Sequence, residues 1–134
     1  MKARVKWVED MKFVGAPPSG HGVVIDGSKE VEVTPMEMLF LGMGGCSLID
    51  VVQILKEFRV DLIDCEVEIE AQRADDIPKV FNRIHAHDIA SCRDLKPAQV
   101  ERAINISVEK YCSASIMLGK TAEITHDYEI VETN

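Results

Sequence analysis

Thiol groups are the side chains in this 134-residue sequence with the greatest capacity for redox chemistry. The four cysteines, Cys46, Cys65, Cys92 and Cys112, are separated by 19, 27 and 20 positions. These spacings contain neither a Cys-x-x-Cys pair nor a zinc-finger pattern, so a structural zinc site is not expected. In a reducing cytoplasm such thiols are buried, inert or redox-active, rather than joined in a disulfide framework.

Cys46 lies within the longest apolar stretch of the chain. No side chain is charged from Met38 to Ile49, whereas a surface helix would show a polar stripe. The preceding residues predict a helix start, with Thr34 as the N-cap, Pro35 at the first helical position and Glu37 completing a capping box. The pattern therefore predicts a core helix that carries Cys46.

Three glycines interrupt this predicted helix next to the thiol. Gly42, Gly44 and Gly45 each destabilise a helix interior by roughly 1 kcal/mol relative to alanine, and close approach of another helix would compensate. Gly42, Gly45 and Cys46 recur at helical spacing, which places a thiol beside a smooth face that a neighbour could reach. A cysteine in an apolar run can also be a small core residue, and sequence statistics alone favour that interpretation over a thiol presented to a neighbour.

Composition and charge limit the possible partners and location of the chain. The net charge of −8 and the lack of a Lys/Arg cluster argue against binding of nucleic acids and of anionic membranes. The apolar run ends at Asp50, well short of the roughly 20 residues that a membrane span needs. The segment from Met1 to Trp7 lacks the apolar core of a signal peptide. We therefore expect one cytoplasmic domain without nucleic-acid or membrane partners.

Strand patterns lie on both sides of the predicted core helix. Alternating segments between Val5 and Asp26 predict three short antiparallel strands. Apolar and polar residues alternate with period two from Ile63 to Gln72, which predicts a strand with one buried face. On this pattern Cys65 points inward, so we interpret it as structural.

A returning strand is predicted from Val80 to Ala90. It places His85 and His87 two apart on one face, a geometry that a metal site could use. No third ligand is evident nearby in the sequence, which favours two partly exposed sheet histidines. Cys92 follows in a predicted loop, where Arg93 could lower its pKa.

The C-terminal part of the sequence predicts two helices and a final strand. Pro97 opens an amphipathic helix. A second, more apolar helix is predicted over Glu109–Leu118, with Cys112 near its centre and Gly119 as its stop. Ala122–Ile130 alternates as the last strand. The order of elements predicts an α+β fold.

Two cysteines on two apolar helices, in GGCSLIDVVQIL and VEKYCSASIML, make the sequence similar to the OsmC/Ohr family of peroxide-reducing proteins, and within it to the YhfA-like branch. The resemblance covers nearly the whole chain and implies one OsmC-like domain over residues 1–134. It also implies an intertwined homodimer in which antiparallel sheets wrap around central helices, with two active sites at the interface. Further matching segments are Met11-Lys12-Phe13, Ser19-Gly20-His21, Thr34-Pro35-Met36-Glu37, Arg93-Asp94-Leu95 and Ile124-Thr125-His126.

The resemblance further implies a thiol peroxidase that reduces small organic hydroperoxides. In the family, the cysteine matching Cys46 attacks the peroxide and becomes a sulfenic acid, and the one matching Cys112 resolves it as a disulfide. A cellular dithiol then reduces the disulfide. Neither a cofactor nor a metal is implied.

The sequence departs from the family pattern in the groups that activate the thiol. Peroxidases of the family place a glutamate directly after an Asn-Pro dipeptide, where this chain has Met36 after Pro35. Glu37 follows one position later, about 100° further around a helix, and Arg4 is the arginine available in the N-terminal region. Glu37 and Arg4 are therefore the candidates for the activating charges.

Two other functions stay open on the sequence. A non-catalytic redox sensor or small-molecule-binding protein would keep the fold and both thiols without turnover. A purely structural role for all four cysteines is the third alternative, and the paired helical contexts of two of them argue against it.

Overall fold

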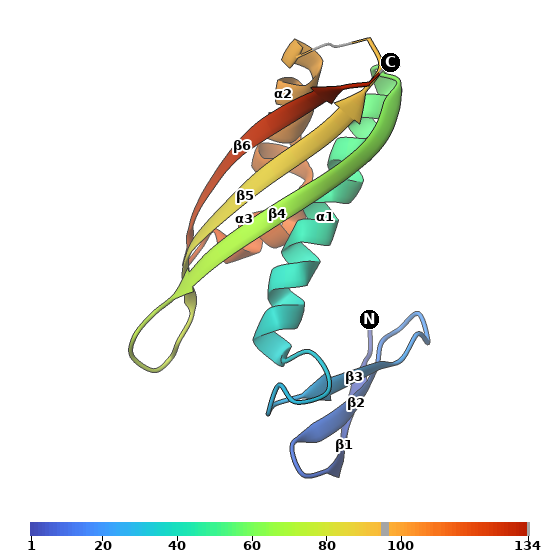
Figure 1. The fold of residues 1–134 in the computed structure, drawn as a ribbon. Helices are drawn as coiled ribbons and strands as arrows, with labels where there is room; N and C mark the ends of the chain where they lie inside the picture. The colour runs from blue at the N-terminus through green and yellow to red at the C-terminus, as the bar shows by residue number, and fades with distance from the viewer. Residues whose placement is uncertain (95–96, 134) are drawn as a thin grey trace. The chain divides into compact units, whose positions relative to one another are not determined.

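The computed structural model describes residues 1–94 and 97–133 (Figure 1). Leu95, which belongs to one of the family-like segments, lies outside the described residues. The chain divides into two compact units, Met1–Leu41 and Gly42–Asn134, which are described separately. The elements are β1 (Arg4–Glu9), β2 (Lys12–Ala16), β3 (Val23–Asp26), α1 (Pro35–Glu57), β4 (Leu62–Arg73), β5 (Phe81–Cys92), α2 (Pro97–Ile106), a π-helical turn η1 (Ser107–Tyr111), α3 (Ser113–Leu118) and β6 (Glu123–Glu132).

The first unit contains the three antiparallel strands that the sequence predicts. They pair in the order β1-β2-β3. Asp26 ends β3 and is fully buried. Its carboxylate accepts hydrogen bonds from the hydroxyl and the N–H of Ser28 and from the N–H of Val31, and these bonds lower its pKa to about 2. The carboxylate thereby fixes the loop that leads into α1.

The predicted start of α1 is confirmed. The Thr34 N–H donates to Glu37 Oε1 at 3.0 Å, and the Glu37 N–H donates to Thr34 Oγ1 at 3.2 Å, which together form a capping box. The hydrogen bond from the Thr34 backbone is the main cause that lowers the pKa of Glu37. Glu37 therefore serves as a capping residue.

The length and apolar character of α1 exceed those of an ordinary surface helix. It has 23 residues, and its most apolar 18-residue window has a mean hydropathy of 1.8 with a third of the residues buried. A helix of this length and composition could cross a membrane, but core helices share both properties. That α1 does not cross a membrane thus stays a prediction, which depends on the charged Asp50 that ends the apolar run.

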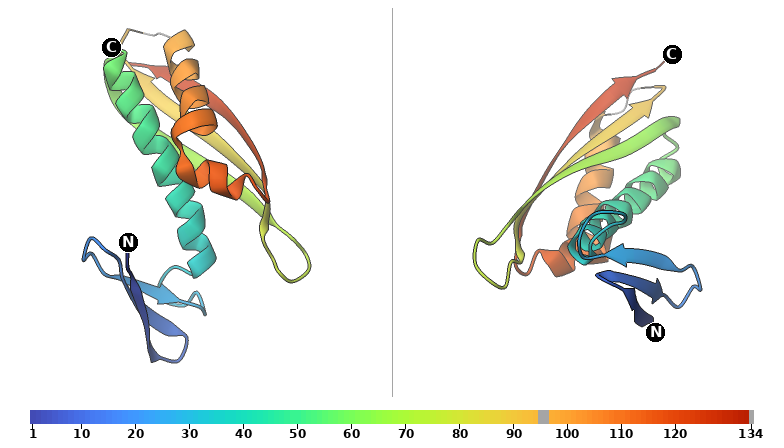
Figure 2. Two further views of the ribbon diagram at one scale, coloured as in Figure 1. Left: turned by 180° about the vertical axis from the view of Figure 1, so that it is seen from behind. Right: turned by 60° about the horizontal axis from the view of Figure 1, so that its bottom comes forward.

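The second unit contains a three-stranded sheet in the order β4-β5-β6. β4 and β5 are antiparallel as predicted, but β6 pairs with β5 in parallel, so the prediction of wholly antiparallel sheets is wrong here. A parallel pair needs a crossover connection, which α2, η1 and α3 supply between the two strands. All the helices of this unit lie on one face of the sheet (Figures 1 and 2).

The core of the second unit lies between this sheet face and the helices. Alternate residues of β5 are buried, as a strand with one covered face requires. The main apolar cluster joins α1, β5 and α2. Its buried residues are Val51, Ile54, Leu55, Val60, Ala90, Cys92, Val100, Ala103 and Ile104.

Cys92 is the last residue of β5 and is fully buried, so its prediction as a loop residue is wrong. Burial raises the pKa of the Cys92 thiol. Arg93, which the sequence indicated could lower this pKa, pairs with Asp61 at 3.2 Å. Cys92 is therefore a core residue.

The predicted helix over Glu109–Leu118 is broken at Cys112. The π-helical turn η1 ends just before this residue, whose backbone is extended at φ −75° and ψ 95°, and α3 begins just after it. Cys112 is thus the N-cap of a new short helix, which ends before Gly119 as predicted. The break turns the Cys112 sulfur toward the first turn of α3.

The glycines of α1 differ in what surrounds them. A Cβ added to Gly44 would overlap Cδ1 of Ile69 in β4, whereas one added to Gly42 or Gly45 meets no atom of residues 1–94 and 97–133 within 4 Å. We predicted that another helix lies close to these glycines. At Gly44 the close neighbour is a strand, and at Gly42 and Gly45 the prediction is wrong within one chain. Their side of α1 is open.

Candidate thiol site

The fold brings Cys46 and Cys112 together. A carboxylate oxygen of Asp50 and the two sulfur atoms all lie within 4.8 Å of one another. Cys46 and Asp50 come from α1, and Cys112 comes from the junction of η1 and α3. Because the two cysteines are far apart in sequence, tertiary packing alone creates this site.

Cys112 is the enclosed thiol of the pair. It is fully buried, and its S–H points to the carbonyl oxygen of Met43 with a sulfur-to-oxygen distance of 4.0 Å. Ser115 donates to the sulfur through its N–H at 3.4 Å and through its hydroxyl at 3.0 Å. Burial raises the pKa of Cys112, the two bonds from Ser115 lower it, and the neighbouring Cys46 raises it again. The hydrogen bonds from Ser115 therefore partly offset the rise that burial causes in the pKa of Cys112.

Cys46 is the more accessible thiol, because it is only half-buried. Its neighbour Ser47 is buried and faces Ser107 of η1, with 3.4 Å between the two hydroxyl oxygens. Ser107 Oγ also lies 3.2 Å from the carbonyl oxygen of Ser47. These contacts hold α1 against η1 and so fix the position of Cys46 relative to the next segment.

Asp50 is a further candidate site residue, which the sequence alone did not indicate. We interpreted it as the end of the apolar run, but it lies one helical turn after Cys46 and therefore on the same face of α1. Its Oδ2 is 3.5 Å from Ser107 Oγ. A groove of about 260 Å³ leads to it, lined by Asp50, Gln53, Ile54, Glu57 and Tyr111. The four-residue spacing of Cys46 and Asp50 was the signal that could have identified it.

The other two thiols lie apart from this chemistry. Cys65 packs against the apolar core from β4, as its alternating pattern predicts. Burial raises its pKa to about 12, with a further contribution from Asp88. Such a thiol stays protonated at neutral pH, and Cys92 is a fully buried core residue.

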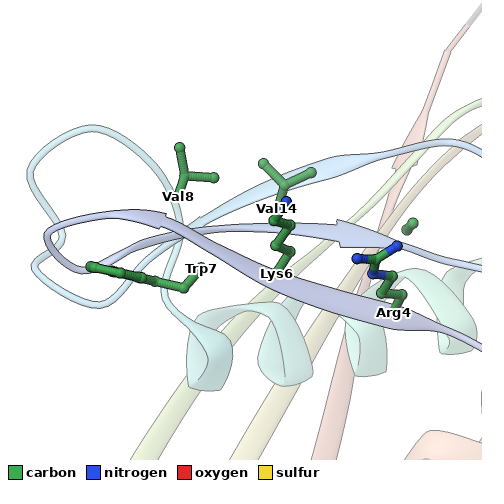
Figure 3. A pocket seen from close by; sticks show the side chains of 6 residues that line it. Arg4, Lys6, Trp7, Val8 and Val14 are labelled. Atoms are coloured by element: carbon green, nitrogen blue, oxygen red, sulfur yellow. The ribbon is translucent and has the colours of Figure 1, made fainter.

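Arg4 and Glu37 belong to the first unit, whereas both thiols belong to the second. Arg4 lies on β1 beside Lys6 along a hollow of about 460 Å³, whose walls also include Trp7, Val8, Val14 and Ala16 (Figure 3). Glu37 holds the start of α1 through Thr34. Catalytic roles for Arg4 and Glu37 stay predictions from the family resemblance.

His85 and His87 are partly exposed sheet histidines, with side chains 39% and 29% exposed. Asp127 of the parallel strand β6 lies between them, 3.1 Å from His85 Nε2 and 2.7 Å from His87 Nδ1. The hydrogen bond to Asp127 is the main cause that raises the pKa of His87, and the same bond lowers the pKa of Asp127. Nothing local in the sequence indicates this third polar group, because Asp127 reaches the histidines only through the pairing of β6 with β5.

The fold and the paired thiols define an OsmC-like protein, and the chain belongs to this family, whose model, described as OsmC-like protein, matches residues 26–127. The matched region contains both Cys46 and Cys112. The chain is 49% identical over 132 residues to Protein YhfA of Escherichia coli K12, with 98% of each chain covered.

Solved structures share the fold at lower sequence identity. An OsmC-like protein from Mycoplasma pneumoniae has a TM-score of 0.84 at 12% identity, and the alignment covers 98% of this chain and 96% of that one. The organic hydroperoxide resistance protein OhrB of Bacillus subtilis has a TM-score of 0.62 at 14% identity, with 96% and 98% covered. The predicted family and an OsmC-like α+β fold are thus confirmed, whereas the predicted homodimer stays a prediction.

Proposed function

We propose that this chain is a cysteine-based thiol peroxidase that reduces small organic hydroperoxides in the cytoplasm. The observation that carries the proposal is the pairing of an accessible thiol, Cys46, with a buried one, Cys112, whose sulfurs lie within 4.8 Å. Membership of the OsmC-like family supports a redox role related to peroxides. The fold shared with OhrB, an organic hydroperoxide resistance protein, supports an organic substrate.

The proposed reaction begins at the more accessible sulfur. The Cys46 thiolate attacks the terminal oxygen of the hydroperoxide, the O–O bond breaks, and the leaving alkoxide takes a proton to become an alcohol. Cys46 is left as a sulfenic acid. The Cys112 thiolate then attacks the sulfenic sulfur, and the departing hydroxide takes a proton to become water. Two thiols and one hydroperoxide give one disulfide, one alcohol and one water, and a dithiol reductant restores both thiols.

Asp50 is the proposed acceptor of the thiol proton. Its carboxylate lies beside both sulfurs. In addition, this chain has Met36 at the position where peroxidases of the family have a glutamate. Ser107 orients the carboxylate from the opposite segment.

One equivalent of cumene hydroperoxide is expected to lower the intact mass of the reduced protein by two hydrogens. The reason is that the sulfurs of Cys46 and Cys112 are close enough to bridge after side-chain rotation. Peptide mapping should find these two residues joined. In Cys112→Ser, which lacks the resolving thiol, the sulfenic acid should persist on Cys46 and react with dimedone.

Two outcomes would contradict the proposal. If all four thiols stay titratable after the hydroperoxide, the chain is a binding or sensing protein and not a peroxidase. If Cys46 is instead joined to Cys92, Cys112 is not the resolving residue.

We further propose a homodimer, because the open side of α1 exposes apolar surface. Leu39, Leu41 and Ile49 are each more than half exposed. A groove of about 430 Å³ follows the same helix, lined by Gly45, Leu48, Ile49, Val52 and Gln53. A second copy of the chain would cover this face, as the family resemblance implies.

Sedimentation is expected to give twice the chain mass of 14.9 kDa. Gly45→Arg should shift the protein to the monomer, because a Cβ at this position meets no atom of the described residues within 4 Å and the arginine would extend from it into the proposed interface. Ala98→Arg, at an exposed position of α2, is the matched control and should leave the dimer intact. A Gly45→Arg protein that sediments as the unchanged dimer would show that α1 is not the interface.

A further inference from the structure

We propose that the reduced thiol site also binds a divalent transition-metal ion, with Zn²⁺ as the best match. Cys46, Asp50 and Cys112 offer two sulfurs and one carboxylate oxygen within 4.8 Å of one another. The sequence analysis expected no zinc site because no two cysteines are close in sequence. The fold removes that objection, since it assembles the three groups from two distant segments.

The donor set suits zinc more than magnesium or calcium. Thiolate sulfur is a soft ligand that selects zinc and related metals, whereas magnesium and calcium prefer oxygen ligands only. Zinc binds sulfur at about 2.3 Å and carboxylate oxygen at about 2.0–2.2 Å in a tetrahedron, so its ligand atoms lie roughly 3.5–3.8 Å apart. The ligand atoms are at most 4.8 Å apart here, so closing the site to that size needs atomic movements of roughly 1 Å.

A neighbouring residue orients the proposed oxygen ligand. Ser107 is fully buried, and its hydroxyl faces Asp50 Oδ2 at 3.5 Å and the carbonyl oxygen of Ser47 at 3.2 Å. Residues in this position fix the direction of a ligand and raise metal affinity. The Asp50 carboxylate therefore has a neighbour, the Ser107 hydroxyl, that is not itself a proposed metal ligand.

Two of the three ligand groups, Cys46 and Asp50, are only partly buried, so the site is not a closed one. Three protein ligands leave the fourth tetrahedral position to water, which is the pattern of exchangeable and not of closed structural zinc sites. Asp50 also lines a groove of about 260 Å³, and Glu57 adds a negative charge along that groove. We therefore infer reversible binding at one ion per chain.

Metal binding and oxidation would exclude each other at these thiols. Coordination of Zn²⁺ by Cys46 and Cys112 replaces two S–H protons, which are released to solvent, so affinity rises with pH. A disulfide between the same residues offers no thiolate. The ion would bind only the reduced protein and would block access of an oxidant to Cys46 while it is bound.

The test is a titration of the reduced full-length protein with Co²⁺, which reports thiolate ligands through a charge-transfer absorption band in the near ultraviolet. One equivalent should saturate the band, and Zn²⁺ should then displace the Co²⁺ and remove it. Cys46→Ser and Cys112→Ser should each weaken the band strongly. Asp50→Asn should weaken binding, and Ser107→Ala should lower the affinity roughly 10-fold while the two thiolates still bind.

Two control variants distinguish this site from other possible metal ligands of the chain. Cys65→Ser should leave the titration unchanged, because its sulfur is in the core. His87→Ala should also leave it unchanged, although it removes one of two histidines beside Asp127. A band that survives Cys46→Ser, or binding that disappears in His87→Ala, would overturn the proposal.

The titration uses no peroxide, so it stays informative whatever the outcome of the peroxidase experiment. Protein oxidised with a general dithiol oxidant to the Cys46–Cys112 disulfide should give no band. A band of unchanged strength in that oxidised protein would also overturn the proposal.

Discussion

Replacement of Cys46 by serine is expected to abolish hydroperoxide consumption, with a loss of roughly 1,000-fold or more in the rate. Cys46 is the accessible thiol beside Asp50 and Cys112, and a serine hydroxyl cannot form the sulfenic acid. The measurement is the disappearance of cumene hydroperoxide in the presence of a dithiol reductant.

Cys65→Ser is the matched control and should keep nearly all of the activity. The Cys65 thiol has a pKa raised to about 12 by burial, and its side chain packs against the core of the sheet. Urea unfolding of both variants should confirm that they are folded. Equal losses of activity in the two variants would show that the assay reports folding and not a specific nucleophile.

Asp88→Asn is expected to stabilise the protein by up to about 3 kcal/mol at pH 8, and by about half as much at pH 5. Asp88 is 2% exposed, and within the described part of the chain neither of its carboxylate oxygens has a hydrogen-bond partner. Burial raises its pKa from 3.8 to about 6, which Asp127 increases and His87 decreases. An ionised Asp88 therefore destabilises the folded state.

The sign of the pH dependence follows from this raised pKa. Between about pH 4 and pH 6 the folded chain binds the Asp88 proton while the unfolded chain has released it, so stability falls as the pH rises through this window. Asparagine has no proton to lose and removes that dependence. Urea unfolding of both proteins at pH 5 and pH 8 measures the difference. A gain from Asp88→Asn that is the same at both pH values would show that Asp88 does not titrate in this range.

The sequence predicted the parts of the fold that local patterns determine. The start of α1 followed from Thr34, Pro35 and Glu37, because a capping box needs only neighbouring residues. The inward position of Cys65 followed from period-two alternation. Both patterns are complete within a few residues of sequence, so no tertiary contact was needed to interpret them.

The parts that the sequence did not predict depend on contacts between distant segments. The break at Cys112 occurs where Ser107 packs against α1 through Ser47, and no local signal marks it. Pairing of β6 with β5 in parallel follows from the helical crossover, and it brings Asp127 to the histidines. The pairing of Cys46 with Cys112 was predicted from the resemblance to a family, because the spacing of the two cysteines in the sequence does not indicate it.

The short distance between the two sulfurs has a kinetic consequence for the proposed cycle. Once Cys46 is a sulfenic acid, the buried Cys112 competes with every further peroxide molecule for it. A tethered thiol that is already in place acts at an effective molarity far above that of any free peroxide in a cell. In the proposed cycle, disulfide formation would therefore be faster than irreversible conversion of Cys46 to the sulfinic acid, and the protein would stay reducible at high peroxide concentration.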